Sequence, residues 1–371
     1  MNATTSADKS ARCLFPGLIS SVLILVCVAQ PAWAGPDGDV LLPLQVSTVP
    51  VSNGDLNPYG LAVVPAHFPG STRHKGQLLV SNFNDSNGCS GKGSTIISVD
   101  PTNGTTGLFF QGTPPIGFTN ALAVAEAGFV FAGSVFTTTD CTTGMAGPLL
   151  VLDKDGNQVT QLGVPPGSQK INGPWGMAIN DRGKTAQLFV SNVLDGTITR
   201  LEVSLTPGAF SVIGTPVTIA SGYNIGTDTN AVVVGPAGLA YDSKNDILYV
   251  AAEKDNKIFA LAGAGTTTTD LGTGALVFAD STLLHGPLGL VLTPSGHLIT
   301  ANADPPTVSS TAGPSELVEV TVSGEFVRTF SIDSASGGAF AVNLVRKGNV
   351  NQLSYVDDNQ STLSILPLID K

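Results

Sequence analysis

The sequence is poor in charge. Only 12% of its 371 residues are Asp, Glu, Lys or Arg, and 17 basic residues face 28 acidic ones, which gives a formal net charge of -11. Such a surface repels phosphate backbones, so we expect no nucleic-acid partner. Low charge together with 43 glycines is more typical of a β-rich extracytoplasmic protein than of a helical cytosolic one.

Long apolar runs are absent after residue 34, so we expect no membrane span in the mature chain. The one apolar stretch, residues 18–29, follows a short basic region and precedes a small-residue cleavage site at residues 32–34. This layout predicts a secretory signal peptide over residues 1–34 and a periplasmic or extracellular protein of residues 35–371. Cys27 leaves a lipid-anchored form as the alternative, although the residue before it is not the small one that such processing requires.

The chain repeats one phrase. The phrase reads Pro-x-Gly-(Leu/Met)-Ala and is followed, after a gap, by an apolar run that ends in Val-(Ser/Ala). A repeat of roughly 50–60 residues, built from short apolar runs and Gly-rich turns, is typical of a β-propeller. The clearest copies are residues 58–62 with 78–82, 174–178 with 188–192, 236–240 with 248–251, and 287–291 with 298–302.

Six repeats fill the mature chain, and each reads as four strands, with the Gly-(Leu/Met)-Ala run innermost. We therefore predict a single all-β domain, a six-bladed β-propeller of four-stranded antiparallel blades. The last repeat lacks an outer strand, and the run Val40–Val46 is predicted to supply it and close the ring, with Pro43 tolerated at an outer edge. The repeats span residues 57–111, 120–162, 172–220, 235–278, 285–330 and 338–368.

The pattern resembles the NHL-repeat type of six-bladed β-propeller over residues 40–368. Propellers of this superfamily include hydrolases similar to gluconolactonase and SMP-30, strictosidine-synthase-like proteins, amidating lyases, virginiamycin B lyase, and many binding or scaffold modules. The resemblance therefore implies the fold and leaves the function open.

Two cysteines, Cys89 and Cys141, remain after removal of the signal peptide. They occupy matching positions after the second strands of neighbouring repeats, which a propeller places side by side. An exported protein meets an oxidising compartment, so we predict a disulfide between them; two free thiols are the alternative.

Polar residues recur where the second strands end and the innermost strands begin, and the topology places both at one mouth of the central channel. Carboxylate and amide oxygens suit Ca²⁺ or Mg²⁺, and the resemblance implies that SMP-30-like hydrolases hold a divalent ion with Glu and Asn or Asp from such positions. Turn capping is the alternative role for each residue. The candidate metal ligands are Asn82, Asn192, Glu253 and Asp357; the candidate ligand-binding residues are Asn57, Asn120, Asn172 and Trp175.

His285 directly precedes Gly286-Pro287, at the position that Asn172 holds in the third repeat. It is the candidate catalytic base, and a hydrogen-bonded structural histidine is the alternative. Tyr59, Trp175 and Phe340 at the channel-side position indicate either an apolar channel lining or packing between blades.

Long loops rich in Ser, Thr, Gly and Pro are predicted on the same face, over Phe83–Gly93, Val135–Gly147 and Ala303–Pro314. Recognition commonly lies in such loops on a rigid scaffold. We therefore predict an exported, monomeric binding or interaction module whose channel face carries a protein or small-molecule partner. The alternatives are a divalent-metal-dependent hydrolase, lactonase-like, or a lyase at the channel mouth, and a purely structural envelope protein.

Overall fold

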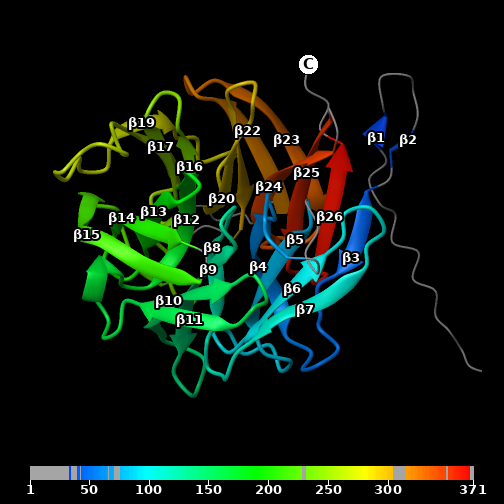
Figure 1. Cartoon of the computed structure of the whole chain (residues 1–371). Helices are drawn as coiled ribbons and strands as arrows, with labels where there is room; N and C mark the ends of the chain where they lie inside the picture. Colours follow the sequence, from blue (N-terminus) through cyan, green and yellow to red (C-terminus); the bar gives the residue numbers. More distant parts are fainter. Residues whose placement is uncertain are drawn as a thin grey trace, which may run out of the picture.

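The computed structural model arranges six four-stranded antiparallel sheets as blades around a central axis (Figure 1). This confirms the predicted six-bladed β-propeller. Most of the predicted signal peptide, residues 1–32, lies outside the described residues. The structure describes residues 33–34, 40–41, 43–65, 67–70, 76–206, 208–227, 231–303, 315–347 and 350–367.

Each blade follows the chain from the innermost strand outward. Blade 1 contains β4 (Leu56–Val63), β5 (Leu78–Asn84), β6 (Thr95–Val99) and β7 (Thr106–Gln111). Blade 2 contains β8 (Phe118–Ala125), β9 (Phe129–Thr137), β10 (Gly144–Asp153) and β11 (Gln158–Leu162). After the short 3-10 helix η1 (Ser168–Lys170), blade 3 contains β12 (Pro174–Asp181), β13 (Thr185–Asn192), β14 (Thr197–Thr206) and β15 (Ala209–Ala220).

The second half of the ring has the same construction. Blade 4 contains β16 (Pro236–Asp242), β17 (Ile247–Ala252), β18 (Lys257–Ala262) and β19 (Ala275–Phe278). Blade 5 contains β20 (Pro287–Leu292), β21 (His297–Asn302), β22 (Ser315–Thr321) and β23 (Phe326–Asp333). Blade 6 contains β24 (Ala339–Lys347), β25 (Val350–Asp357), β26 (Thr362–Pro367) and the N-terminal β3 (Leu44–Ser47).

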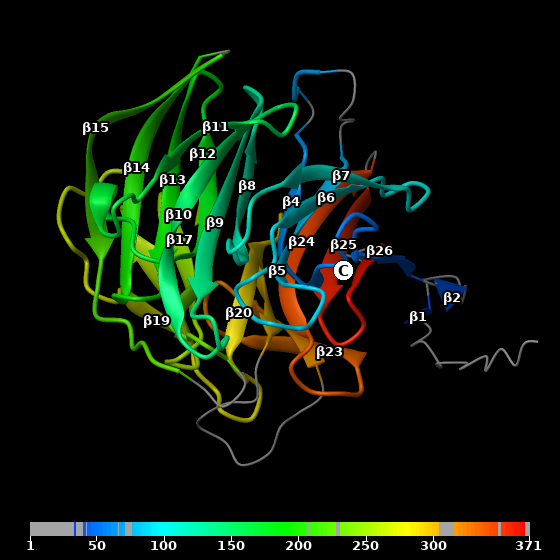
Figure 2. The same cartoon turned by 90° about the horizontal axis from the view of Figure 1, so that it is seen from below.

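The ring closes through β3, as the sequence predicted. β3 runs antiparallel to β26, with Leu44 opposite Ile365 and Ser47 opposite Thr362, and the two strands lie side by side in blue and red in Figure 1. The predicted strand is too long at its start. Residues Val40–Leu41 (β2) pair instead with Trp33–Ala34 (β1), and this small pair lies outside the ring in both views (Figures 1 and 2). Pro43 lies just before β3, where it removes no ladder hydrogen bond.

In four blades, a repeated glycine marks a bulge where the innermost strand approaches the next blade. In blade 3 the register shifts between Pro174 and Gly176. A Cβ on Gly176 would lie 1.9 Å from the carbonyl oxygen of Ala237 in blade 4. The Ser191 hydroxyl donates to that same oxygen at 2.8 Å and accepts the N–H of Gly176 at 2.8 Å. The repeat therefore encodes the contact between blades, because only glycine leaves room for it.

The centre of the ring is filled by side chains. Tyr59, Trp175, Ala237, Leu288 and Phe340, which precede the small residue of the bulge in their blades, belong to one buried cluster. The Tyr59 ring lies 5.2 Å from that of Trp175, two blades away, and 4.6 Å from that of Phe340. The contact between Tyr59 and Trp175 passes over blade 2, whereas that between Tyr59 and Phe340 joins neighbouring blades. The rings therefore both line the channel and pack between blades, which were the two interpretations.

One predicted loop is shorter than expected. β9 continues to Thr137 and β10 begins at Gly144, so most of the predicted loop Val135–Gly147 is strand, with only residues 138–143 between the two. The register shift between Ala146 and Leu149 explains the misreading, because a bulge in a Gly- and Thr-rich stretch interrupts the apolar alternation. Of the predicted loop Ala303–Pro314, residues 304–314 lie outside the described residues. Within the part of the chain that the structure describes, no helix has the length and apolar character needed to span a bilayer.

Candidate functional site

A cavity of about 220 Å³ opens where the innermost strands begin. The sequence predicted this face as the functional one, because strand starts and second-strand ends meet there; Pro58 pairs with Asn82 and Pro174 with Asn192. The cavity is lined by Asn57, Tyr59, Phe83, Asn84, Ser90, Trp175, Ala231, Val232, Val233, Ser336, Gly337, Phe340 and Asp358.

Four aromatic side chains line this cavity. In addition to the contacts of Tyr59 with the other two rings, the Phe83 ring lies 5.1 Å from that of Tyr59 and meets the Trp175 ring edge-on at 5.6 Å. All four side chains, those of Tyr59, Phe83, Trp175 and Phe340, are at most 4% exposed. Rings packed against one another in this way are preorganised, since none can rotate without displacing its neighbour.

Three lining residues carry a buried polar atom without a hydrogen-bond partner: Asn57 through Oδ1, Asn84 through Oδ1, and Trp175 through the indole Nε1. Asn57 also has a positive φ of 59°, an uncommon backbone conformation for which asparagine is one of the tolerated residues. Buried polar groups are normally satisfied, and leaving one unpaired costs about 1–3 kcal/mol. Polar groups of this kind concentrated around one cavity are typical of a ligand site.

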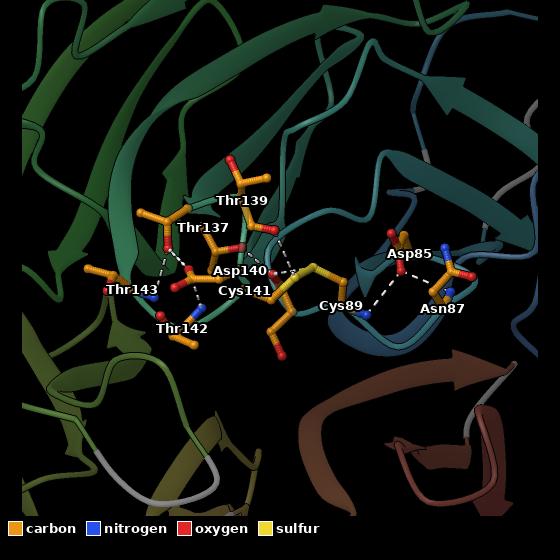
Figure 3. Close-up of a disulfide and its surroundings, with 11 residues drawn as sticks. Asp85, Asn87, Cys89, Thr137, Thr139, Asp140, Cys141, Thr142 and Thr143 are labelled. Carbon is orange, nitrogen blue, oxygen red and sulfur yellow. Dashed lines mark hydrogen bonds between the residues drawn. A yellow bond between two sulfur atoms is a disulfide. The ribbon is translucent and has the colours of Figure 1, made fainter.

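A disulfide fastens one side of the mouth. Cys89 and Cys141 are joined, with their Cα atoms 5.6 Å apart, which confirms the predicted pairing against free thiols (Figure 3). It links the loop between β5 and β6 to the turn between β9 and β10. Ser90, next in the chain, lines the cavity, and its carbonyl oxygen accepts a hydrogen bond from the Thr137 hydroxyl. The Asp85 carboxylate accepts the N–H of Cys89 at 3.0 Å (Figure 3). The covalent link therefore holds a wall of the cavity in place.

The candidate metal ligand Asn192 is fully buried and turned onto its own blade. Its amide nitrogen lies 3.0 Å from the Lys170 carbonyl oxygen and from the hydroxyls of Thr197 and Thr199. Its Oδ1 accepts the N–H of Asn172 at 2.9 Å. These contacts are those of a side chain that caps the entry into the innermost strand, which was the alternative role for this position.

The other three candidate ligands are also buried at second-strand ends. The Asn82 amide donates to the Thr48 carbonyl oxygen at 3.2 Å, while its Oδ1 has no hydrogen-bond partner. Glu253 is 5% exposed, and its backbone N–H donates to the Gly235 carbonyl oxygen at 3.0 Å. Burial raises the pKa of Asp357 to about 6, and the neighbouring Asp333 carboxylate adds to the increase. None of the four candidates lines the channel-mouth cavity.

His285 and Asn172 also lie outside that cavity. The His285 N–H donates to Oδ1 of Asn302 at 3.0 Å, matching the bond from Asn172 to Asn192, and its Nε2 lies 3.3 Å from the Thr282 carbonyl oxygen. The repeat thus uses an asparagine at the end of the second strand to fix the residue before Gly-Pro.

Asn120 is separated from Asn57 by the closed centre of the channel. It lines a second cavity of about 290 Å³ that is formed around the ends of the innermost strands, together with aliphatic side chains such as Leu122 and Leu239. The candidate ligand-binding residues therefore divide, because Asn57 and Trp175 share the first cavity and Asn120 lines the second. Among the described residues, no group of three or more His, Cys, Asp or Glu is arranged to hold a metal ion.

The sequence analysis did not single out Asn84, Ser90, Ser336 and Asp358 as cavity residues, although Asn84 and Ser90 lie in the predicted recognition loop Phe83–Gly93. Asp358 follows Asp357 at the end of a second strand, so the same rule could have found it. Ser90 adjoins a predicted disulfide cysteine, which is a second usable signal. Ser336 lies between a strand of one blade and the first strand of the next, and no pattern distinguishes it from other exposed turn residues.

Comparison with solved structures supports the fold, whereas comparison of the sequence with known families and curated proteins finds no match. No protein-family profile and no curated protein sequence matches the chain. Among solved structures, it is similar to the gluconolactonase XC5397 from Xanthomonas campestris, with a TM-score of 0.51 and 15% identity over 85% of this chain and 87% of that one. It is also similar to regucalcin, a calcium-binding protein from Agrobacterium tumefaciens, with a TM-score of 0.51 and 11% identity over 88% and 93% of the two chains. The chain is therefore a six-bladed β-propeller that shares its overall fold with these two proteins.

Proposed function

We propose that this protein is an exported binding module that takes a small organic ligand in the channel-mouth cavity. The observation that carries the proposal is the combination of a rigid aromatic lining with the buried, unpaired polar atoms of Asn57, Asn84 and Trp175. Export rests on the signal-peptide pattern of residues 1–34, and the Cys89–Cys141 disulfide agrees with an oxidising compartment.

Occlusion of the cavity tests this proposal. Ser336 lines the mouth and is exposed, so Ser336→Trp should block the cavity without disturbing the core. Ser243→Trp, in the exposed turn between β16 and β17, is the matched control. A screen of small organic molecules by thermal shift should yield compounds that raise the Tm of the wild type and of Ser243→Trp but not of Ser336→Trp. Compounds that stabilise all three proteins equally, or no stabilising compound at all, would contradict the proposal.

The second candidate function is that of an enzyme, either a lactonase-like hydrolase that depends on a divalent metal ion or a lyase. Two observations favour it: Asn82 and Asp357, at equivalent positions of neighbouring blades, each carry a buried oxygen without a hydrogen-bond partner. Asn82, Glu253 and Asp357 would supply oxygens to Ca²⁺ or Mg²⁺, whereas Asn192 fits a capping role better because its amide already makes four hydrogen bonds.

Metal content decides between the two candidates. The purified protein would be treated with EDTA and then supplied with Ca²⁺ or Mg²⁺ while its bound metal and Tm are measured. A divalent ion that raises the Tm in the wild type and not in Glu253→Gln would favour the hydrolase or lyase. An unchanged Tm with no bound ion would remove its basis.

A further inference from the structure

The charge on the described residues that line the channel-mouth cavity is negative. Asp358 is its one ionisable acid, and none of the described residues that line it is Lys, Arg or His. Asp357, the preceding residue in β25, is a second acidic side chain in this part of the chain. The whole chain carries a formal charge of -11. No described lining residue offers a positive charge to an anionic ligand, whereas a cation would be attracted from solution and at the site.

Two of the three buried polar atoms without a partner among the described residues that line the cavity are hydrogen-bond acceptors. They are Oδ1 of Asn57 and Oδ1 of Asn84. N–H groups of a ligand could satisfy the two amide oxygens. The unpaired indole N–H of Trp175 is the exception, and it requires an acceptor on the body of the ligand.

The remaining lining suits the organic part of such a ligand. Tyr59, Phe83, Trp175 and Phe340 present aromatic surface, and Ala231, Val232 and Val233 present small apolar side chains. Aromatic rings attract cations through their quadrupoles, and they also bury apolar surface. A volume of about 220 Å³ limits the occupant to a small molecule.

We infer that the cavity binds a small organic amine in its ammonium form, with its N–H groups donated to the Asn57 and Asn84 amide oxygens and its charge facing Asp358. An ether or hydroxyl oxygen on the same molecule accepts the Trp175 N–H. This inference rests on the proposed function, because it specifies the ligand of that same cavity.

Three probes with one scaffold and different charge test the inference: 2-phenoxyethylammonium, the neutral 2-phenoxyethanol, and the anion phenoxyacetate. Isothermal titration calorimetry measures their affinities for the purified protein. Quenching of Trp175 fluorescence reports binding in the cavity, because the chain has only two tryptophans and the other, Trp33, lies in the predicted signal peptide. We expect the ammonium ion to bind at least about tenfold tighter than the alcohol, which corresponds to about 1.4 kcal/mol, and the anion to bind most weakly.

Variants assign the charge preference to the cavity. Asp358→Asn should bring the ammonium ion and the alcohol to similar affinity, and Asn84→Asp should increase the preference for the cation. Asp155→Asn, in the exposed turn between β10 and β11, removes one negative charge elsewhere and should leave the preference unchanged. If Asp358→Asn folds poorly, Asn84→Asp still tests whether charge in the cavity sets the preference for the ammonium ion over the alcohol.

The outcomes separate this inference from the proposal beneath it. Equal binding of the ammonium ion and the alcohol to the wild type, blocked by Ser336→Trp, would overturn the ammonium assignment and leave the binding cavity standing. The ammonium assignment would also fall, and the binding cavity would stand, if compounds from the screen bind the wild type but not Ser336→Trp while the ammonium probe does not bind. Failure of the screen and of all three probes would overturn both.

Discussion

Gly176→Ala is expected to destabilise the propeller by about 3 kcal/mol. The new Cβ would lie 1.9 Å from the Ala237 carbonyl oxygen of the next blade, closer than side chains and backbone oxygens approach. Overpacking of a tight site costs about 1–3 kcal/mol. The shift would also disturb the buried Ser191 hydroxyl, which bonds both Gly176 and Ala237, and each such hydrogen bond is worth about 1 kcal/mol. Because φ at Gly176 is not positive, backbone strain adds nothing.

Urea unfolding followed by circular dichroism measures this effect, with Gly107→Ala as the matched control. Gly107 is exposed in the outer strand β7, and a Cβ there would lie 3.3 Å from the Ser98 hydroxyl oxygen, a tight contact that a shift of a few tenths of an ångström in that side chain relieves. The control should be neutral or slightly stabilising, since alanine restricts the unfolded chain. With an unfolding entropy of about 2.1 cal/mol/K per residue over about 330 residues, a loss of 3 kcal/mol lowers Tm by about 4 °C.

Equal stability of Gly176→Ala and Gly107→Ala would refute the reasoning. It would show that neighbouring blades can separate locally without cost. The repeated glycine would then need an explanation other than close approach between blades.

Three further predictions concern the disulfide, the capping asparagines and the buried carboxyl. Replacing Cys89 and Cys141 together by Ser should lower the free energy of unfolding by about 2–4 kcal/mol, because the link closes a loop with a sequence separation of 52; insensitivity of the wild type to reductant in urea unfolding would contradict this. Asn192→Asp should cost about 1–3 kcal/mol, since a carboxylate would face the Lys170 carbonyl oxygen, and a gain of stability with added Ca²⁺ would instead support the metal hypothesis. The pKa of Asp357 is about 6 in the folded protein against 3.8 ordinarily, so the native state binds its proton more tightly and stability should fall as pH rises from about 4 to 6. Asp357→Asn should flatten that slope, and an unchanged pH profile of urea unfolding would count against the assignment.

The architecture could be predicted because each repeat contains a short sequence motif that forms its structure locally. Pro-x-Gly-(Leu/Met)-Ala or a close variant of it encodes the bulge and the contact with the next blade in four blades. The second and sixth repeats lack the proline but keep the apolar run at the same position, so the number of blades follows from the number of repeats. The cysteine pairing followed from the same regularity, since Cys89 and Cys141 hold matching positions in adjacent repeats. The third strand of blade 2 was harder to delimit, because the bulge between Ala146 and Leu149 interrupts its pattern.

The candidate site could be predicted only as a face of the ring. Asn57 and Trp175 were identified from their position, and both line the cavity. Asn120 looked equivalent and lines the opposite one, since blade 2 lacks the proline and its innermost strand pairs with a different register. Asn84 and Ser336 could not be selected, because their importance depends on where neighbouring blades place them.

The sequence by itself determined the blades, their order, the closing strand and the disulfide, because each depends on short-range patterns repeated at a fixed period. The tertiary structure decided what the centre of the ring contains. Tyr59 and Trp175 are more than a hundred residues apart, and only closure of the ring brings their rings to 5.2 Å and seals the channel between two cavities. It also decided which asparagines cap turns and which line a cavity. Asn192 donates to the Lys170 carbonyl oxygen, whereas Asn57, at the start of an innermost strand, lines the channel-mouth cavity.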